Sequence, residues 1–312
     1  VERMGLGYED LRKVNPHLVY VSISGYGASG PYAHRMAFDG VLQSMTGYPV
    51  MQGAANGPDA PPQLVNNFVC DKATSWSAVQ AVLAALYARA AGKCLGQHVE
   101  IAMLDAGASF FWPDAMALTG EMIVDKDVPY TGTVSRDPRL SLLFPTSDGH
   151  GAIQMWPESP FFARALRVFL PEVDNDDPRF FGSIEARRQH FHLFTDAVKA
   201  DFAKRTNAEL QRFLDEVDLP GSAVIDLKDF HRDPQVVHNK LVREHDTGGP
   251  LGTIRELRPA PKMSVTPLRI GGWMGGRGTC TREVLSGLAG YTESELKSMK
   301  QAGVFGDVEV GV

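Results

Sequence analysis

The sequence has few cysteines and no excess of basic residues. Its three cysteines, Cys70, Cys94 and Cys280, are far apart, and no CxxC pair or His/Cys ligand spacing connects them. This pattern argues against a disulfide framework or a structural zinc site and favours a reducing compartment. Lys and Arg total 31 against 37 Asp and Glu, which gives a net charge of −6. General nucleic-acid binders usually carry a basic excess, so we do not expect that class.

Long hydrophobic runs are missing as well. No apolar stretch reaches the ~18–20 residues that a membrane-spanning helix requires, and no charged segment followed by an apolar one opens the chain. The 312 residues are 44% hydrophobic and 22% charged, which excludes the disordered and collagen-like classes. The apolar content is sufficient for one large domain or two smaller ones. We therefore predict a globular, cytoplasmic protein without membrane or nucleic-acid partners.

The first 120 residues alternate between helical and strand patterns. The strongest pattern, 72–91, has apolar residues around most of its surface, which is typical of a buried helix, and Gly92 is a suitable stop. A long loop is expected over 47–67. Helices are expected at 8–15, 37–46, 72–91 and 105–120, and strands at 18–24 and 97–104. This order predicts an α/β layer with parallel strands.

The pattern changes after about residue 125. A hairpin is expected over 142–156, turning at Asp148-Gly149, and a strand-rich patch over 222–270. The glycine tract 271–278 lacks the Lys-Ser/Thr ending of a phosphate loop and is interpreted as a crossover between domains. Helices are expected at 158–169, 184–205, 207–217, 281–289 and 292–302. We predict a large α/β domain over 1–135, a smaller mixed α+β domain over 136–265, and a C-terminal return to the large domain over 266–312.

A glycine pattern follows the strand expected at 18–24. The stretch 25–30 spells GxGxxG, which is the spacing of a dinucleotide-binding loop. That loop must open directly into a helix whose first amides meet the pyrophosphate, with an acidic residue ~20 positions further on. Here Pro31 and an irregular stretch follow, and Asp39 comes too early. The pattern therefore favours a tight turn or a glycine-rich loop that lines some other ligand.

Asp71 stands at the start of the helix expected over 72–91. Aspartate is a favoured N-cap because its carboxylate accepts a hydrogen bond from an unpaired backbone N–H. The same position also suits chemistry: the helix dipole favours an ionised carboxylate, which can attack an activated acyl group while nearby backbone amides stabilise the oxyanion. Both interpretations stay open. The preceding Cys70 has no obvious partner base and is interpreted as a small buried residue.

Motifs for metal ions and for serine nucleophiles are not found. His190 and His192 are two residues apart on a helical pattern and do not share a face. His231 and His238 are too far apart for a pair of ligands on one helix. The HExxH, EF-hand and GxSxG patterns are missing too. We therefore expect no metal site.

Several segments, taken in order, resemble the class III CoA-transferases, the CaiB/BaiF family that includes formyl-CoA transferase and carnitine CoA-transferase. Each motif is loose by itself, but their order and spacing are specific and cover nearly the whole chain. The segments are ERMGLGYEDLRKVNPHLVYVSISGYGASGPY (2–32), AFDGVLQSMTG (37–47), 71–92, GQHVEIAMLDA (96–106), SDGHGAIQM (147–155), DPQVVHNK (233–240) and TREVLSGLAGYTESELKSMKQAGV (281–304). The resemblance implies a Rossmann-like large domain with a parallel sheet.

The resemblance also implies a reaction. Asp71 falls on the family's catalytic aspartate, whose carboxylate attacks a donor acyl-CoA to give a mixed anhydride and then an aspartyl-CoA thioester. The acceptor carboxylic acid reverses these steps and leaves as the new acyl-CoA. No metal or redox cofactor is needed, and CoA takes part as a substrate. The implied CoA-binding residues are Arg3, Met4, Phe38, Asp39 and Met103, with the arginine suited to the phosphates of CoA.

Some positions depart from the family pattern. Met36 and Phe38 stand where the formyl-CoA branch carries Lys and Tyr, which argues against oxalate or formate as substrates. Gly278 and the three residues after it replace the usual Gly-Glu-His-Thr, and the glycine-rich flap over the active site is not identified. An α-methylacyl-CoA racemase of the same fold is the alternative enzyme, although Phe38 occupies the place of its proton-transferring histidine. A truncated, non-catalytic CoA-binding homologue is the other alternative.

Two further expectations come from the resemblance. Family members form interlocked dimers of ring-shaped subunits, so we expect a homodimer. The chain opens at Val1 in the middle of a helical pattern, where family members have a further α/β segment with contacts to CoA. We therefore expect that the large domain over 1–135 is incomplete at its N-terminus.

Overall fold

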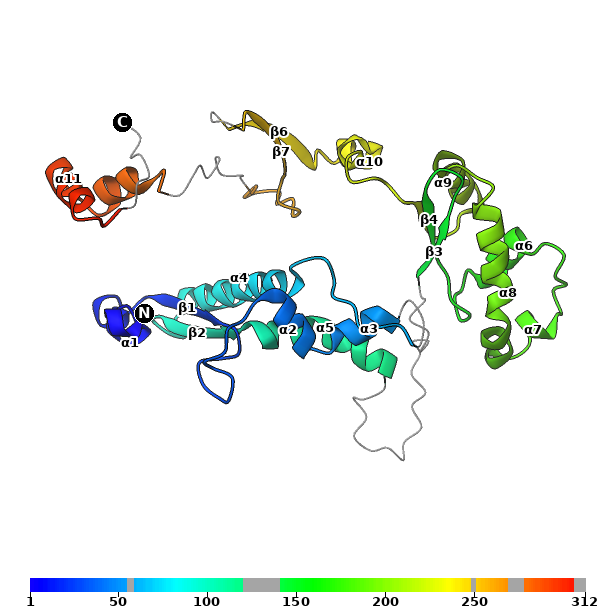
Figure 1. Ribbon diagram of the computed structural model, residues 1–312, viewed down its shortest axis with the longest axis horizontal. Helices are drawn as coiled ribbons and strands as arrows, with labels where there is room; N and C mark the ends of the chain where they lie inside the picture. Colours follow the sequence, from blue (N-terminus) through cyan, green and yellow to red (C-terminus); the bar gives the residue numbers. More distant parts are fainter. Residues whose placement is uncertain (55–58, 120–140, 248–250, 269–277, 306–312) are drawn as a thin grey trace. The chain divides into compact units, whose positions relative to one another are not determined.

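The computed structural model describes residues 1–54, 59–119, 141–247, 251–268 and 278–305 (Figure 1). The chain divides into two compact units, Val1–Ala223 and Val224–Val312. Within the described ranges, no helix is both long enough and apolar enough to cross a membrane. The sequence predicts three parts instead, with boundaries at about residues 135 and 265, and that division stays a prediction.

Two parallel strands form the centre of the first part of the chain. Strands β1 (Val19–Ser24) and β2 (Gln97–Ala102) pair in register from Val19 opposite Gln97 to Ser24 opposite Ala102. Parallel neighbours need a long crossover connection. That connection holds the helices α2 (Asp39–Met45), α3 (Tyr48–Ala54) and α4 (Val69–Ala90). The 3-10 turn η1 (Glu2–Met4) and α1 (Tyr8–Val14) precede β1, and α5 (Met103–Thr119) follows β2. The α/β layer predicted from the sequence is therefore confirmed.

Two predictions for this part were wrong. Helix α3 lies inside the stretch 47–67, which was expected to be a loop because of its proline and glycine content. Pro49 stands in the first turn of that helix, where the missing N–H of proline has no cost. Helix α4 is also far less buried than its composition indicates. Its buried side chains are only Cys70, Thr74 and Ala85.

The limited burial of α4 follows from what packs against it. The helix contacts β1, β2, α2 and α5, and these elements cover one side of it. On the other side Trp76 is 71% exposed and Tyr87 is 76% exposed. An apolar pattern around a helix does not say how much of its surface is covered, because that depends on elements elsewhere in the chain.

A small apolar cluster joins α2, α4 and α5 beside the carboxyl ends of the two strands. Leu42, Cys70 and Phe111 are its buried members, and the ring of Tyr48 stacks on Phe111 with 3.9 Å between centroids. Gly107 on α5 faces Cys70 so closely that a Cβ added there would lie 2.8 Å from Sγ. The absence of a side chain at this glycine therefore permits the close approach of α4 and α5.

The stretch 141–223 forms a separate mixed layer. Strands β3 (Ser141–Pro145), β4 (His150–Gln154) and β5 (Gly221–Ala223) make an antiparallel sheet in the order β3-β4-β5. Its helices are α6 (Phe162–Phe169), α7 (Pro178–Phe181), α8 (Ile184–Phe202) and α9 (Asn207–Val217). Phenylalanines dominate its core, with Phe162, Phe194 and Phe202 almost fully buried. The hairpin predicted to turn at Asp148-Gly149 is confirmed.

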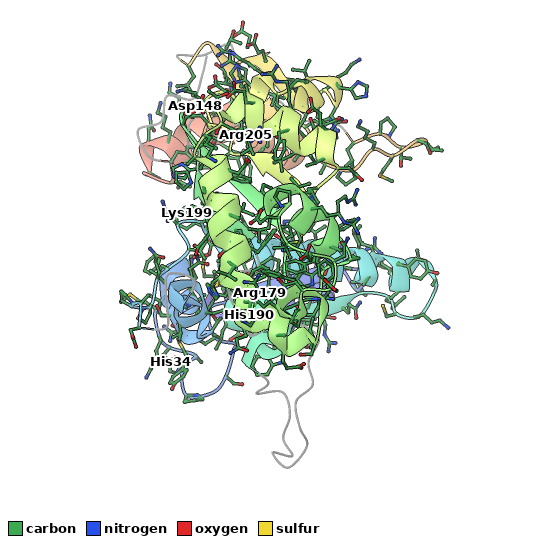
Figure 2. The ribbon with its side chains drawn as sticks, turned by 90° about the vertical axis from the view of Figure 1, so that its right-hand side faces the viewer. His34, Asp148, Arg179, His190, Lys199 and Arg205 are labelled. Carbon is green, nitrogen blue, oxygen red and sulfur yellow. The ribbon has the colours of Figure 1, made fainter. Side chains whose placement is uncertain are left out.

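The hairpin turn is tied to the connection between α8 and α9. Asp148 Oδ1 accepts a hydrogen bond from the backbone N–H of Asn207 at 2.7 Å. The N–H of Ser147 donates to the carbonyl of Arg205 at 2.8 Å. Figure 2 shows Asp148 and Arg205 near the end of α8, with Arg179 and His190 near its start. These bonds fix the sheet against the helices.

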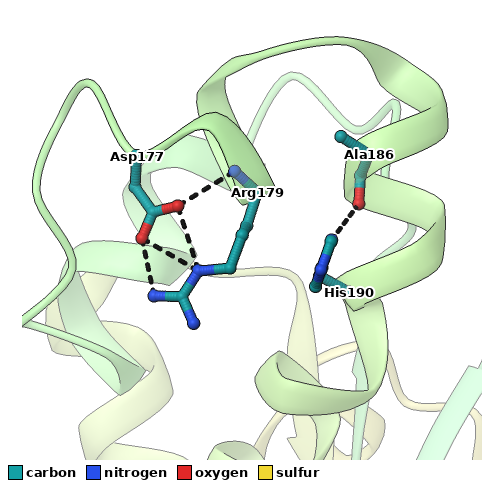
Figure 3. Close-up of polar contacts among 4 residues, drawn as sticks. All are labelled: Asp177, Arg179, Ala186 and His190. Atoms are coloured by element: carbon teal, nitrogen blue, oxygen red, sulfur yellow. Dashed lines mark hydrogen bonds and ion pairs between the residues drawn. The ribbon is translucent and has the colours of Figure 1, made fainter.

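A charged pair stands just before α8 (Figure 3). Asp177 caps α7, and its carboxylate accepts bonds from the backbone N–H and the guanidinium of Arg179, at 2.9 Å and 2.7 Å. These bonds hold the pKa of Asp177 below its ordinary value. Arg179 is exposed and Asp177 is half-buried. Asp177 accepts from a backbone N–H at the start of α7, so we assign the pair to capping.

The second compact unit contains one hairpin and short helices. The hairpin consists of β6 (Val242–Asp246) and β7 (Thr253–Leu257), after the turns η2 (Phe230–Arg232) and α10 (Pro234–His238). A π-helical turn, η3 (Glu283–Leu288), and α11 (Glu293–Gln301) confirm the two helices predicted near the end of the chain. Most of the glycine tract predicted as a crossover lies outside the described residues.

Candidate active site

Asp71 is the third residue of α4, and its side chain is exposed. The helix begins at Val69, so its N-cap is Phe68, whose side chain cannot form a cap hydrogen bond. The interpretation of Asp71 as the N-cap was therefore wrong. Its carboxylate is not needed to hold the helix start, although it still stands in the first turn, where the dipole favours negative charge.

A different carboxylate holds the start of α4. Asp39, in the first turn of α2, is only 6% exposed. Its Oδ2 accepts a hydrogen bond from the backbone N–H of Asp71 at 3.0 Å. The first amides of a helix have no partner within the helix, and here the partner comes from a second helix. The site thus contains one buried carboxylate that binds backbone and one exposed carboxylate.

Gln43 completes this arrangement, and the sequence analysis did not identify it. The side chain is 2% exposed, and its Nε2 lies 2.5 Å from Oδ1 of Asp39. Nε2 also reaches the carbonyl oxygens of Val65 and Asn67, at 3.3 Å and 3.0 Å, while Oε1 accepts from the N–H of Val65 at 3.0 Å. The spacing of four residues from Asp39 was a usable signal for the first of these bonds.

The amides around Asp71 are largely occupied. The N–H of Val69 donates to the carbonyl of Asn67 at 2.9 Å, and the N–H of Asp71 donates to Asp39. Backbone amides next to Asp71 were predicted to stabilise an oxyanion. These two already have acceptors, so either could serve an oxyanion only by giving up its present bond.

Cys70 precedes Asp71 and is fully buried. Burial, together with the nearby carboxylates of Asp39 and Asp71, raises the pKa of its thiol to about 11. Since the thiolate is the reactive form of cysteine, Cys70 is not a nucleophile at neutral pH. The interpretation of Cys70 as a small packing residue is confirmed.

The remaining predicted residues take different positions. Met103, the first residue of α5, packs against the cluster that contains Cys70. Phe38 directly precedes Asp39 and is 71% exposed. Arg3 and Met4 lie in η1, both exposed. No hydrogen bond or ion pair among the described residues joins Arg3 to the two aspartates.

The glycine loop after β1 does not open into a helix. The next helix is α2, beginning at Asp39, so the geometry of a dinucleotide loop is not present, as predicted. Gly27 has a positive φ of 104° and donates its N–H to Ser24 Oγ at 3.0 Å. A Cβ on Gly25 would lie 2.2 Å from the Cβ of Ala37. The loop therefore packs against the residues that lead into α2 and helps to position Asp39.

An open groove lies between α4 and α5, with a volume of about 530 Å³. Its lining is mainly apolar and consists of Val69, Lys72, Ala73, Trp76, Ser77, Gln80, Ala106, Ser109 and Phe110. Asp71 is not part of this lining. Within the described ranges, no cluster of three or more His, Cys, Asp or Glu side chains could hold a metal ion.

The sequence matches the model of CoA-transferase family III over residues 1–272. The succinyl-CoA–D-citramalate CoA-transferase of Chloroflexus aurantiacus is 28% identical, with 96% of this chain and 72% of the relative covered. The succinyl-CoA:glutarate CoA-transferase of Mus musculus is 27% identical, with 97% and 67% covered. The succinate–glutarate CoA-transferase of Agrobacterium fabrum is 28% identical, with 86% and 64% covered. The chain thus spans only part of the length of each relative.

Solved structures show the same fold. A CAIB/BAIF family protein from Brucella suis aligns with a TM-score of 0.70 at 24% identity, covering 92% of this chain and 72% of that chain. The protein Rv3272 from Mycobacterium tuberculosis aligns with a TM-score of 0.68 at 23% identity, covering 87% and 70%. The α/β fold class predicted from the sequence is confirmed by these alignments.

Proposed function

Because this chain belongs to CoA-transferase family III, we propose that it moves CoA from an acyl-CoA thioester to a carboxylic acid, with Asp71 as the nucleophile. The family resemblance and the enzyme class predicted from the sequence, a CoA-transferase, are confirmed by the family match and the named relatives. The proposal covers the acyl-CoA donor, the acceptor acid, the reaction steps and the residues that perform these steps.

The proposed reaction has two symmetrical halves. The carboxylate of Asp71 attacks the thioester carbonyl, the C–S bond breaks, and a mixed anhydride and CoA thiolate result. The thiolate attacks the aspartyl carbonyl and releases the donor acid with one aspartate oxygen, leaving an aspartyl-CoA thioester. The acceptor carboxylate repeats these steps in reverse, so one of its oxygens stays on Asp71. Covalent catalysis divides a difficult exchange into easier steps.

The contact between the two aspartates carries this proposal. Asp39 holds the backbone of Asp71 through its N–H, and the carboxylate of Asp71 is left exposed. A nucleophile must reach its substrate, and a carboxylate in the first turn of a helix is favoured in its ionised form. Asp71 is exposed and stands in the first turn of α4, whereas the buried Asp39 is engaged with Gln43 and the backbone of α4.

No permanently bound cofactor is part of the proposal, and CoA enters as a substrate. We assign CoA contacts to Arg3, Met4, Phe38, Asp39 and Met103 on the strength of the family resemblance. Arginine matches the geometry and charge of the CoA phosphates. The named relatives use succinyl-CoA with D-citramalate or glutarate, so short dicarboxylic acids and their CoA thioesters are the first substrates to test.

The direct test is mass spectrometry of the Asp71 peptide. The protein is incubated with an acyl-CoA donor and an acceptor acid whose carboxylate carries heavy oxygen. We expect a CoA or acyl adduct on Asp71 that hydroxylamine removes, and one labelled oxygen on Asp71 after turnover. Asp105→Asn is the matched control, because Asp105 is also an exposed aspartate in the first turn of a helix. It should label as the wild type does, and Asp71→Asn should not label.

The alternatives give different outcomes in the same experiment. A racemase exchanges the α-proton of the acyl group with deuterated water and leaves no adduct. Phe38, which stands where a racemase needs a proton carrier, has no titratable group. A non-catalytic homologue gives neither exchange nor adduct. Full transfer activity in Asp71→Ala would contradict the proposal outright.

Two broader expectations stay within the proposal: a cytoplasmic location and a homodimer. The exposed face of α4 supports the homodimer. Trp76, Val79, Leu83 and Tyr87 recur at helical spacing and are between 59% and 76% exposed. Large contiguous apolar surfaces are typical of interfaces between subunits, and a second copy of the chain is the occupant we propose.

A further inference from the structure

Among the described residues of the α/β layer, Gln43 is the most buried polar side chain, and its neighbours fix its orientation. Its Oε1 accepts from the N–H of Val65, while its Nε2 faces three oxygens, on Asp39, Val65 and Asn67. An amide group has two N–H donors. The two shorter contacts, to Asp39 and Asn67, therefore account for both hydrogens, and the carbonyl of Val65 shares one of them.

Asp39 and Asn67, the two acceptors of Gln43, each bind a backbone N–H in the first turn of α4. Asp39 accepts from the backbone N–H of Asp71. The carbonyl of Asn67 accepts from the backbone N–H of Val69, the first residue of α4. Gln43 donates to both acceptors, so it fixes the groups that bind the first and third residues of the helix. A single buried amide thereby determines where the first turn of α4 lies relative to α2.

We propose that Gln43 is a positioning residue of the active site: through Asp39 and Asn67 it sets the orientation of the Asp71 carboxylate for attack on the thioester. This inference rests on the proposed function of Asp71. Gln43 need not touch the substrate. Its effect is to keep the nucleophile within the narrow range of positions that attack requires, and small displacements of a reacting group are costly to its rate.

Glutamine suits this task because its amide does not titrate. One oxygen of Asp39 binds the N–H of Asp71 and the other binds Gln43, so both oxygens of this buried carboxylate have a donor. Gln43→Glu keeps the size of the side chain but replaces the donor with a carboxylate facing that of Asp39. Gln43→Met keeps a similar volume without any charge and removes the donors to Asp39 and Asn67.

The test is the single-turnover rate of adduct formation on Asp71, measured against acyl-CoA concentration. We expect a rate about 10- to 100-fold lower in both Gln43→Glu and Gln43→Met, with the half-saturating acyl-CoA concentration unchanged. Asp39→Asn combined with Gln43→Glu restores an amide opposite a carboxylate and should recover part of the rate lost in Gln43→Glu. A merely structural role predicts loss of folded protein without this separation of rate from binding.

Gln211→Glu is the matched control. Gln211 on α9 donates to Asp215, four residues away on the same helix, at 3.0 Å, and accepts from the N–H of Ala223 at 3.1 Å. Gln211→Glu therefore also replaces an amide donor with a carboxylate that faces an aspartate, far along the chain from Asp71. We expect its adduct rate to equal that of the wild type even where urea unfolding shows a comparable loss of stability.

The outcomes separate the two claims. If folded Gln43→Met labels Asp71 at the wild-type rate, Gln43 is not a positioning residue, and the proposed function still stands. An unchanged rate accompanied by weaker acyl-CoA saturation also overturns the inference, because it assigns Gln43 to binding. If the wild-type Asp71 never forms an adduct with any donor, the proposed function fails and this inference fails with it.

Discussion

Oδ2 of Asp39 lies 3.0 Å from the backbone nitrogen of Asp71, and this hydrogen bond joins residues that are 32 positions apart in the chain. It gives α4 the capping interaction that Phe68, at the N-cap, cannot supply. The buried carboxylate of Asp39 therefore holds the helix start, whereas the carboxylate of Asp71 is exposed, as the proposed nucleophile has to be.

Replacing Asp39 should reduce stability in a way that depends on what replaces it. Asp39→Ala removes the acceptor of the N–H of Asp71 and of one N–H of Gln43, and each unsatisfied buried donor costs about 1–3 kcal/mol. Asp39→Asn keeps an oxygen for the N–H and should lose less. Urea unfolding measures both. Asp105→Ala, at an exposed position in the first turn of α5, is the control and should change the free energy of unfolding by less than about 0.5 kcal/mol. Equal losses for the two Asp39 variants would contradict this account.

Gly107 offers a test of the packing between α4 and α5. On helix propensity alone, Gly107→Ala should stabilise the protein by about 0.5–1 kcal/mol. The added Cβ would lie 2.8 Å from Sγ of Cys70, and overpacking of this kind costs about 1–3 kcal/mol. We therefore expect a net loss of stability. In the Cys70→Ala background the sulfur is gone, and Gly107→Ala should become neutral or stabilising. A double-mutant cycle from urea unfolding measures this coupling, and additive effects would contradict it.

Much of the fold could be predicted because its signals are local. The strands β1 and β2, the hairpin at Asp148-Gly149 and the helix over Asn207–Val217 have a clear period or turn residues. Helix α3 could not be predicted because Pro49 is usually a loop signal and is tolerated here only as part of a first turn. The exposure of α4 could not be predicted either, since it depends on what covers the helix.

The candidate site was only partly visible in the sequence. Local rules left Asp71 with two interpretations, and the family motif around it favoured the chemical one. Gln43 was missed because its partners Val65 and Asn67 lie 22 and 24 residues further along the chain, beyond any helical or strand period. The error in assigning the N-cap has the same origin, because the group that binds the helix start comes from a different helix.

Cys70 should be unreactive in the folded protein. Burial raises its pKa to about 11, so at pH 8 to 9 nearly all of it is thiol. Iodoacetamide should label the exposed Cys280 first, and Cys70 should label only after unfolding. Fast labelling of Cys70 in the native state would contradict its burial.

The raised pKa of Cys70 also predicts that the stability of the protein depends on pH. The folded state keeps the proton of Cys70 up to about pH 11, whereas the unfolded chain loses it near the ordinary thiol pKa of 9.0. Between these values the unfolded state binds fewer protons, so the free energy of unfolding falls as the pH rises. Below about pH 9 the shift has no effect. Urea unfolding across this range should show a steeper fall for the wild type than for Cys70→Ala, and equal slopes would contradict the prediction.

The exposed face of α4 predicts the oligomeric state. Trp76 is 71% exposed and belongs to an apolar surface with Val79, Leu83 and Tyr87. If a second copy covers this surface, Trp76→Glu buries a charge in the interface and should convert the dimer to monomer. Sedimentation velocity over a range of protein concentrations measures the change, with circular dichroism to show that the variant is folded. Val14→Glu places a charge at an 85% exposed apolar residue of α1 and should leave the dimer intact. A monomeric wild type, or a Trp76→Glu variant that stays dimeric, would show that this face is not the dimer interface.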